Sequence, residues 1–147
     1  MAKLTKSIEI EASPEKVFTF TNDLKKRNAT REGWAEAKYT SEGPVGVGTT
    51  IHYVGVAAGK RAEWDMEIVE FVKNKKTASR IIGAGKSKMA DSLTFEPTAK
   101  GTTMTFYMEY EVPYSILGKL IDELMVSKDM EKGMSNMLEN MKKALET

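Results

Sequence analysis

Residues 102–113 have the sequence TTMTFYMEYEVP, and residues 114–145 continue YSILGKLIDELMVSKDMEKGMSNMLENMKKAL. In the first stretch, large apolar residues alternate with threonine, tyrosine and glutamate, which is the two-residue period of a strand with one buried face. These apolar residues are Met104, Phe106, Met108 and Tyr110. After Pro113 the apolar residues recur every three or four positions without a further proline, which predicts one long helix over residues 115–145.

The segments before this strand show the same alternation, and turns rich in glycine, proline or asparagine separate them. The predicted strands are 4–12, 35–41, 49–57, 61–72, 77–82, 88–96 and 102–112. Between the first two, Ser13-Pro14 has the pattern of a helix N-cap followed by proline at the first helical position. Asn22-Asp23 separates this helix from a second short one over residues 24–32. The order predicts an α+β fold in which a seven-stranded antiparallel sheet grips the long C-terminal helix.

The composition limits the kinds of function that the chain can have. The 147 residues fit a single domain, residues 1–147, and their formal net charge of +1 gives no bulk attraction for nucleic acid. The chain has no cysteine and one histidine, so neither a metal site nor a disulfide is expected. The short basic run Lys25-Lys26-Arg27 is interpreted as a solvated rim.

No stretch approaches the roughly 20 apolar residues that span a bilayer, and the N-terminus lacks the apolar core of a signal peptide. We therefore expect a cytoplasmic protein without stable membrane insertion. Gly85-Lys86-Ser87 lacks the earlier glycine of a phosphate-binding loop, and Gly46-Val47-Gly48 lacks the third glycine of a dinucleotide fingerprint. No cofactor is expected.

Five segments in register resemble the START-like, or SRPBCC, helix-grip superfamily, and in particular its polyketide cyclase/dehydrase-like branch. They are IEIEASPEKVFTFTND (8–23), YTSEGPVGVGTTI (39–51), MEIVEF (66–71), LTFEPTAKGTTMTFYMEYEVP (93–113) and GKLIDELMVSKDMEKGMSNMLENMKKALE (118–146). The resemblance covers nearly the whole chain, and it implies a cavity for an apolar small molecule between the sheet and the C-terminal helix. Relatives often carry tryptophan and proline in the second short helix. Here residues 24–31 are mostly polar, so the mouth is expected to be more polar or differently closed.

Alternation along the strands then predicts which side chains line that cavity. Methionine is prominent among them, and its flexible, polarizable side chain suits a surface that adapts to varied apolar partners. Asp91 shares a strand face with these residues, so a carboxylate would enter an apolar space and need a partner, water or a ligand. The predicted lining is Trp34 near the entrance, then Trp64, Met66, Met89, Asp91, Met104, Phe106, Met108, Tyr110, Leu117, Leu120, Ile121 and Leu124.

The leading functional hypothesis is the binding of a hydrophobic or amphipathic small molecule, such as a lipid, a polyketide or an isoprenoid. A cyclase or dehydratase is the alternative, with Asp91, His52, Tyr53 or Tyr107 as proton-transfer groups. A protein-interaction module of the co-chaperone kind is a third hypothesis. The alternation leaves open which face of its strand carries His52 and which carries Tyr53.

Overall fold

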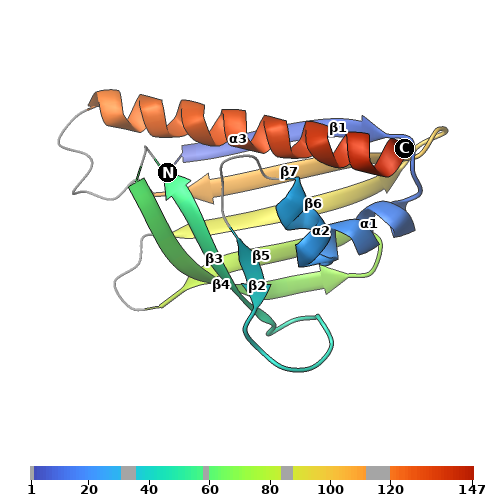
Figure 1. Ribbon diagram of the computed structural model, residues 1–147, viewed down its shortest axis with the longest axis horizontal. Helices are drawn as coiled ribbons and strands as arrows, with labels where there is room; N and C mark the ends of the chain where they lie inside the picture. The colour runs from blue at the N-terminus through green and yellow to red at the C-terminus, as the bar shows by residue number, and fades with distance from the viewer. Residues whose placement is uncertain (1, 31–35, 58–59, 84–87, 112–119) are drawn as a thin grey trace.

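The computed structural model describes residues 2–30, 36–57, 60–83, 88–111 and 120–147, and for residues 56, 57, 60 and 120–126 it describes the backbone alone (Figure 1). The elements are β1 (Ala2–Ile10), α1 (Pro14–Asn22), α2 (Leu24–Ala29), β2 (Ala37–Tyr39), β3 (Thr50–Ala57), β4 (Lys60–Val72), β5 (Lys76–Ile82), β6 (Met89–Pro97), β7 (Thr102–Tyr110) and α3 (Leu120–Glu146). This order confirms the predicted one, with a shorter second strand than expected.

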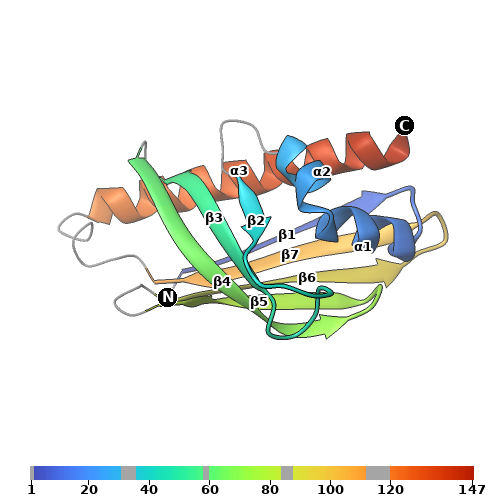
Figure 2. The same ribbon diagram turned by 60° about the horizontal axis from the view of Figure 1, so that its bottom comes forward.

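The seven strands form one antiparallel sheet in the order β1-β7-β6-β5-β4-β3-β2. The first strand therefore pairs with the last, while β2 lies at the opposite edge. The chain crosses between these edges through α1 and α2, and α3 returns across the same face of the sheet (Figures 1 and 2). The predicted helix-grip fold, a sheet holding a long C-terminal helix, is confirmed.

Two capping side chains determine where the two short helices begin. The Ser13 hydroxyl accepts a hydrogen bond from the Lys16 amide at 3.3 Å, and Pro14 follows at the first helical position. Asp23 interrupts the helix in an extended conformation, and its carboxylate accepts from the Lys26 amide at 3.2 Å to begin α2. The break predicted at Asn22-Asp23 is therefore confirmed.

Gly101, in the turn between β6 and β7, lies in close contact with the backbone at the end of β1. A Cβ atom at this position would lie 2.2 Å from the carbonyl oxygen of Ile10 and 2.7 Å from the amide of Ala12, so only glycine fits without a backbone shift. The neighbouring Thr102 hydroxyl donates to the Ala12 carbonyl at 2.7 Å. These contacts fix the point at which the chain leaves the sheet and enters α1.

The long strand β4 carries an irregularity in its pairing with β5 between Ile68 and Glu70. The intervening Val69 is exposed, whereas Ile68 is buried. A bulge of this kind bends a strand and increases its twist. Ile68, next to the bend, packs in one cluster with Leu24 of α2.

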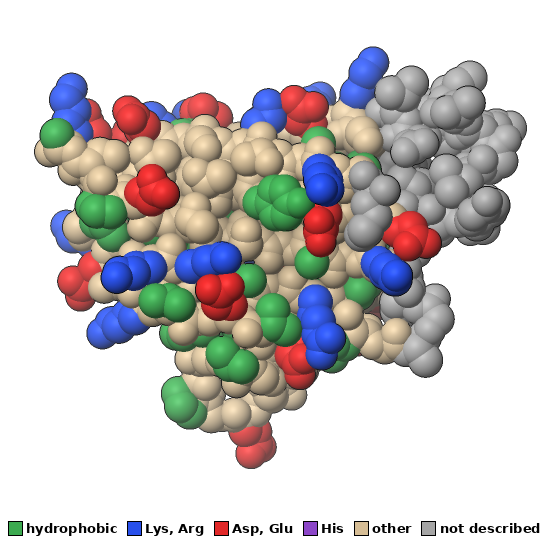
Figure 3. Space-filling view, turned by 180° about the vertical axis from the view of Figure 1, so that it is seen from behind, with side chains coloured by type: hydrophobic (Ala, Val, Ile, Leu, Met, Phe, Trp, Pro, Cys, Tyr) green, Lys and Arg blue, Asp and Glu red, His purple; other side chains and the backbone are tan. Residues whose placement is uncertain are grey.

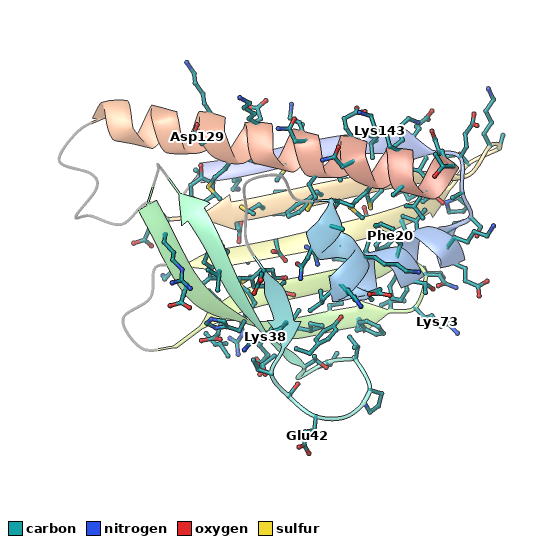
Figure 4. The ribbon with its side chains drawn as sticks, in the orientation of Figure 1. Phe20, Lys38, Glu42, Lys73, Asp129 and Lys143 are labelled. Atoms are coloured by element: carbon teal, nitrogen blue, oxygen red, sulfur yellow. The ribbon has the colours of Figure 1, made fainter. Side chains whose placement is uncertain are left out.

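A closely packed core fills the space beneath the second half of α3. It contains Ile10, Val17, Phe18, Leu93, Phe95, Met104, Phe106, Met134, Met137, Leu138 and Met141. Met104 and Met141 have no exposed surface. Met134, Met137 and Met141 pack α3 on this core, and Figure 4 shows the exposed side chains of Asp129 and Lys143 on the opposite side of the helix.

The face seen from behind carries lysines and arginines interspersed with aspartates and glutamates, with separate apolar side chains between them (Figure 3). No gathering of one charge sign is visible in the coloured part of this view. None of the helices in the described part of the chain is long and apolar enough to cross a membrane.

Candidate functional site

A small cavity lies between the sheet and the short helices. Its lining mixes seven polar side chains with four apolar ones: Asn22, Arg27, Tyr39, Tyr53, Thr77, Ser79 and Asp91, and Ile51, Ile68, Leu93 and Phe106. Its volume is about 20 Å³, which is room for one water molecule. The cavity is thus a polar pocket within an otherwise apolar layer.

Strand alternation supplies the floor of the cavity. On β5 and β6, Thr77 pairs with Leu93 and Ser79 pairs with Asp91, so four lining residues form two adjacent cross-strand pairs. Asp91 also pairs with Met108 of β7. Because residues two apart share a face, Asp91 is on the same side of β6 as the buried Leu93 and Phe95. The expected inward position of Asp91 is what the structure shows.

Tyr39 closes one end of the cavity from β2. Its hydroxyl donates a hydrogen bond to the Asn22 carbonyl at 2.7 Å, which ties β2 to the end of α1. Burial raises the pKa of Tyr39 to about 12, with smaller upward contributions from Tyr53 and Asp23 and an opposing one from the Arg27 charge. Tyr39 is therefore neutral, and its hydroxyl hydrogen is already donated to the Asn22 carbonyl.

Arg27 enters the same cavity from α2, and the residue is only 9% exposed. Its Nε is buried and has no hydrogen-bond partner among the described residues. The interpretation of the Lys25-Lys26-Arg27 run as a solvated rim is wrong for Arg27. Lys25 and Lys26 are exposed, but Arg27 lies three residues after the buried Leu24 and shares its inward helix face.

The phase of β3, which the sequence left open, is now fixed. Tyr53 is buried, lines the cavity and stacks on Trp64, with ring centroids 5.6 Å apart and an interplanar angle of 8°. His52, the preceding residue, therefore projects from the other face. There its Nδ1 lies 2.8 Å from Asp65 Oδ1 and its Nε2 lies 3.4 Å from Glu63 Oε1.

These outer carboxylates raise the pKa of His52, chiefly through the hydrogen bond with Asp65 and then that with Glu63. Tyr107 is also on the outer face, where its hydroxyl donates to Glu109 at 2.9 Å. That hydrogen bond raises the pKa of Tyr107. Of the four groups considered for proton transfer, the structure places Asp91 and Tyr53 at the cavity and places His52 and Tyr107 away from it.

The predicted lining residues occupy several different places. Asp91 and Phe106 line the cavity. Trp64 and Met66 pack in the adjacent cluster formed with Leu24, Ile51, Tyr53 and Ile68, and Met104 lies in the closed core beneath α3. Met89 and Met108 pack around Tyr110, whose hydroxyl is 2.8 Å from Ser127 Oγ of α3. Trp34 and Leu117 lie outside the described residues, and so do the side chains of Leu120, Ile121 and Leu124.

Sequence reasoning did not select most of the polar lining. Thr77 and Ser79 could have been found, because they alternate on a strand that pairs with the strand of Asp91. Arg27 and Tyr39 could not be found in this way, since α2 has six residues and β2 has three, too few for a clear period. Whether any lining residue contacts a ligand stays a prediction.

Comparison with known proteins supports the fold. A family model described as polyketide cyclase / dehydrase and lipid transport matches residues 1–146. No curated protein matches the sequence. Among solved structures, TTHA0849 from Thermus thermophilus is similar, with a TM-score of 0.84 and 21% identity over 98% of this chain and 97% of that one.

Two further structures widen the comparison. The di-domain ARO/CYC StfQ from the steffimycin biosynthetic pathway has a TM-score of 0.77 and 12% identity, covering 98% of this chain and 50% of that one. Ara h 8.0201 has a TM-score of 0.68 and 14% identity, covering 98% of this chain and 97% of that one. Likeness at these identities establishes the shared fold alone.

Proposed function

We propose that this chain, which belongs to the polyketide cyclase / dehydrase and lipid transport family, binds an apolar or amphipathic small molecule between its sheet and its helices. The observation that carries the proposal is the cavity, where four apolar side chains, those of Ile51, Ile68, Leu93 and Phe106, meet several hydrogen-bonding side chains. Sites for small molecules combine apolar side chains with polar groups that orient the ligand, and in this cavity the polar lining residues outnumber the apolar ones. The proposed ligand class is a lipid, a polyketide or an isoprenoid.

Ligand entry requires the cavity to widen, because about 20 Å³ is far below the roughly 300–1,000 Å³ of typical ligand sites. Methionines lie on both sides of the cavity, with Met66 packed beside Ile51 and Ile68 and Met108 paired with Asp91. Methionine has three rotatable bonds and repacks at low cost. We expect its side chains to move aside when a ligand binds.

A dehydratase or cyclase is the second candidate, and the convergence of Asp91 and Tyr53 on one cavity favours it. In such a reaction Asp91 would take a proton from a carbon next to a carbonyl group, and Tyr53 would donate one to the carbonyl oxygen. The structural likeness to StfQ, an ARO/CYC protein, makes this candidate worth testing. If it is right, turnover of a poly-β-ketone substrate depends on pH and Asp91→Asn abolishes it while binding persists.

Native mass spectrometry of the protein after gentle purification tests the binding proposal. We expect a mass above that of the 16.4 kDa chain, and release of an apolar compound on denaturation. A matched sample of the Met108→Trp variant should carry less of the compound. Bare protein in both samples, together with no binding of apolar dyes, would contradict the proposal. Cell fractionation of the tagged protein checks the further expectation that it acts in the cytoplasm.

A further inference from the structure

We infer that Arg27 is the anchor for an anionic group, a carboxylate or a chemically similar oxyanion, at one end of the bound small molecule. The inference rests on the proposed function, since it assigns a chemical class to the ligand of that same cavity. It starts from Arg27, a cationic side chain that is nine-tenths buried and lines the cavity.

A buried guanidinium is costly unless it is paired. The cost of burying an arginine side chain is offset only when hydrogen bonds or an opposite charge satisfy the guanidinium. Its Nε is shielded from solvent and has no hydrogen-bond partner in the described part of the chain. A ligand oxyanion would supply the missing acceptor, and the planar guanidinium suits a two-oxygen acceptor better than a single atom.

The groups around Arg27 fit an oxyanion. Tyr39 is neutral and donates its proton to the Asn22 carbonyl, so it offers no negative charge. Thr77 and Ser79, which pair with Leu93 and Asp91, add two hydroxyl groups that can donate hydrogen bonds to the body of the same ligand. The surrounding apolar side chains lower the local dielectric and strengthen an ion pair that forms there.

Asp91 is the one carboxylate among the lining residues, and it limits where the anion can lie. It stands on β6, whereas α2 packs on β2, four positions away in the sheet order. We therefore place the anionic end of the ligand beside α2 and Tyr39, and its apolar body across the floor toward Phe106. Removing the Asp91 charge should strengthen the binding of an anion rather than weaken it.

Two naphthalene dyes that differ in a sulfonate provide the test. Anilinonaphthalene sulfonate carries an anionic group, and N-phenyl-naphthylamine is its neutral counterpart. Fluorescence titration measures the affinity for each dye. Arg27→Met should lower the affinity for the sulfonate about tenfold or more, which is the size expected for the loss of a charged hydrogen bond. The same variant should change the affinity for the neutral dye by less than about twofold.

Lys26→Met is the matched control, because it removes the same charge from an exposed position of the same helix. It should leave both affinities unchanged within about twofold. Arg27→Lys should lose part of the sulfonate affinity, since it keeps the charge without the planar fork. Asp91→Asn should raise the affinity for the sulfonate relative to that for the neutral dye.

The readout is the ratio of the affinities for the two dyes, because a general loss of binding lowers both affinities and leaves their ratio unchanged. Circular dichroism checks folding, and Arg27→Lys and Arg27→Gln replace Arg27→Met if that variant unfolds. Equal losses for both dyes, or equal effects of Arg27→Met and Lys26→Met on the sulfonate, would overturn the anchor while leaving the binding proposal intact. If neither dye binds the unaltered protein, the binding proposal fails and the anchor fails with it.

Discussion

The two ends of the space between sheet and helices have opposite characters. Beneath the second half of α3 the sheet meets a dry core in which Met104 and Met141 have no exposed surface. Beneath α2 the same sheet face carries the cavity with Arg27 and Asp91. Both ends rest on alternating strands, and the cavity end differs because β5 and β6 place Thr77, Ser79 and Asp91 inward there while α2 adds Arg27. One end is a closed core, and the other carries the polar side chains of the proposed ligand site.

The closed core should account for the largest loss of stability. Phe95 is 2% exposed and packs edge-on against Phe18 at 5.4 Å, so Phe95→Ala should lower the free energy of unfolding by about 3–5 kcal/mol. Urea titration measures this. Val69→Ala, at the exposed bulge of β4, is the control and should stay within about 0.5 kcal/mol. A loss below about 1 kcal/mol for Phe95→Ala would show that this end is not close-packed.

The same change, methionine to tryptophan, can be made beside the cavity and in the closed core, and the two variants should differ in stability and in dye binding. Met108→Trp should cost only about 1–3 kcal/mol, because Met108 is partly buried beside the cavity, and it should weaken uptake of the neutral dye by filling space. Met104→Trp has no room in the core and should cost more. Thermal melts and dye titrations compare them. If dye uptake were unchanged in folded Met108→Trp, the position of the binding site would be wrong.

Tyr39 connects β2 to α1, and its removal should have a moderate effect. Tyr39→Phe deletes the 2.7 Å hydrogen bond to the Asn22 carbonyl and should cost about 1 kcal/mol. The folded pKa of Tyr39, about 12, lies above its ordinary value of 10.0. The folded state then binds the proton more tightly, so this stabilisation is present below pH 10 and is lost as the pH rises toward 12.

Urea titrations between pH 9 and 12 of the two proteins, at about half-unit steps, test the Tyr39 account. The fall in stability with rising pH should be shallower in Tyr39→Phe than in the unaltered chain. Tyr107→Phe is a comparison on the outer face: it removes a tyrosine whose pKa is raised by its hydrogen bond to Glu109 instead of by burial. Parallel curves for the unaltered protein and Tyr39→Phe would contradict a raised pKa at this position.

The smallest effect is expected on the outer face, at His52. Its pKa is raised by Asp65 and Glu63, so the stabilisation is complete below pH 6.5 and is lost as the pH rises through the raised value. Proton NMR of the imidazole should report a pKa above 6.5 in the unaltered protein, falling in Asp65→Asn. Dye affinity should not change with this titration, because His52 does not line the cavity. A dye affinity that follows the His52 titration would contradict the assigned faces of β3.

The fold could be predicted from the sequence because the strand and helix patterns of apolar residues run over long segments and are unambiguous. The strand of Met104, Phe106 and Tyr110 and the helix of Met134, Met137 and Met141 each repeat their pattern several times, and burial follows both. The order of the predicted strands and the closing helix predicted the gripping arrangement, and the family resemblance agreed with it. The bulge beside Val69 could not be predicted, since one additional residue leaves the alternation of β4 nearly unchanged.

The site was predicted less completely, for a physical reason. Asp91 and Phe106 were found because strand alternation places them inward. Arg27 was missed because a charged side chain next to two exposed lysines looks solvated, and only the packing of α2 on the sheet buries it. Tyr53 had no clear phase until the register with β4 placed it opposite Trp64. Polar residues at a ligand site break the hydrophobic pattern that sequence reasoning uses.

Methionine methyl NMR tests the central claim, that a ligand binds at the polar end and leaves the closed core unchanged. The protein is labelled at its ten methionine methyl groups, and the signals are assigned by single Met→Leu variants. On saturation with N-phenyl-naphthylamine, the signals of Met66 and Met108 should shift while those of Met137 and Met141 stay in place. Shifts of Met137 and Met141 with Met66 and Met108 unmoved would contradict the account.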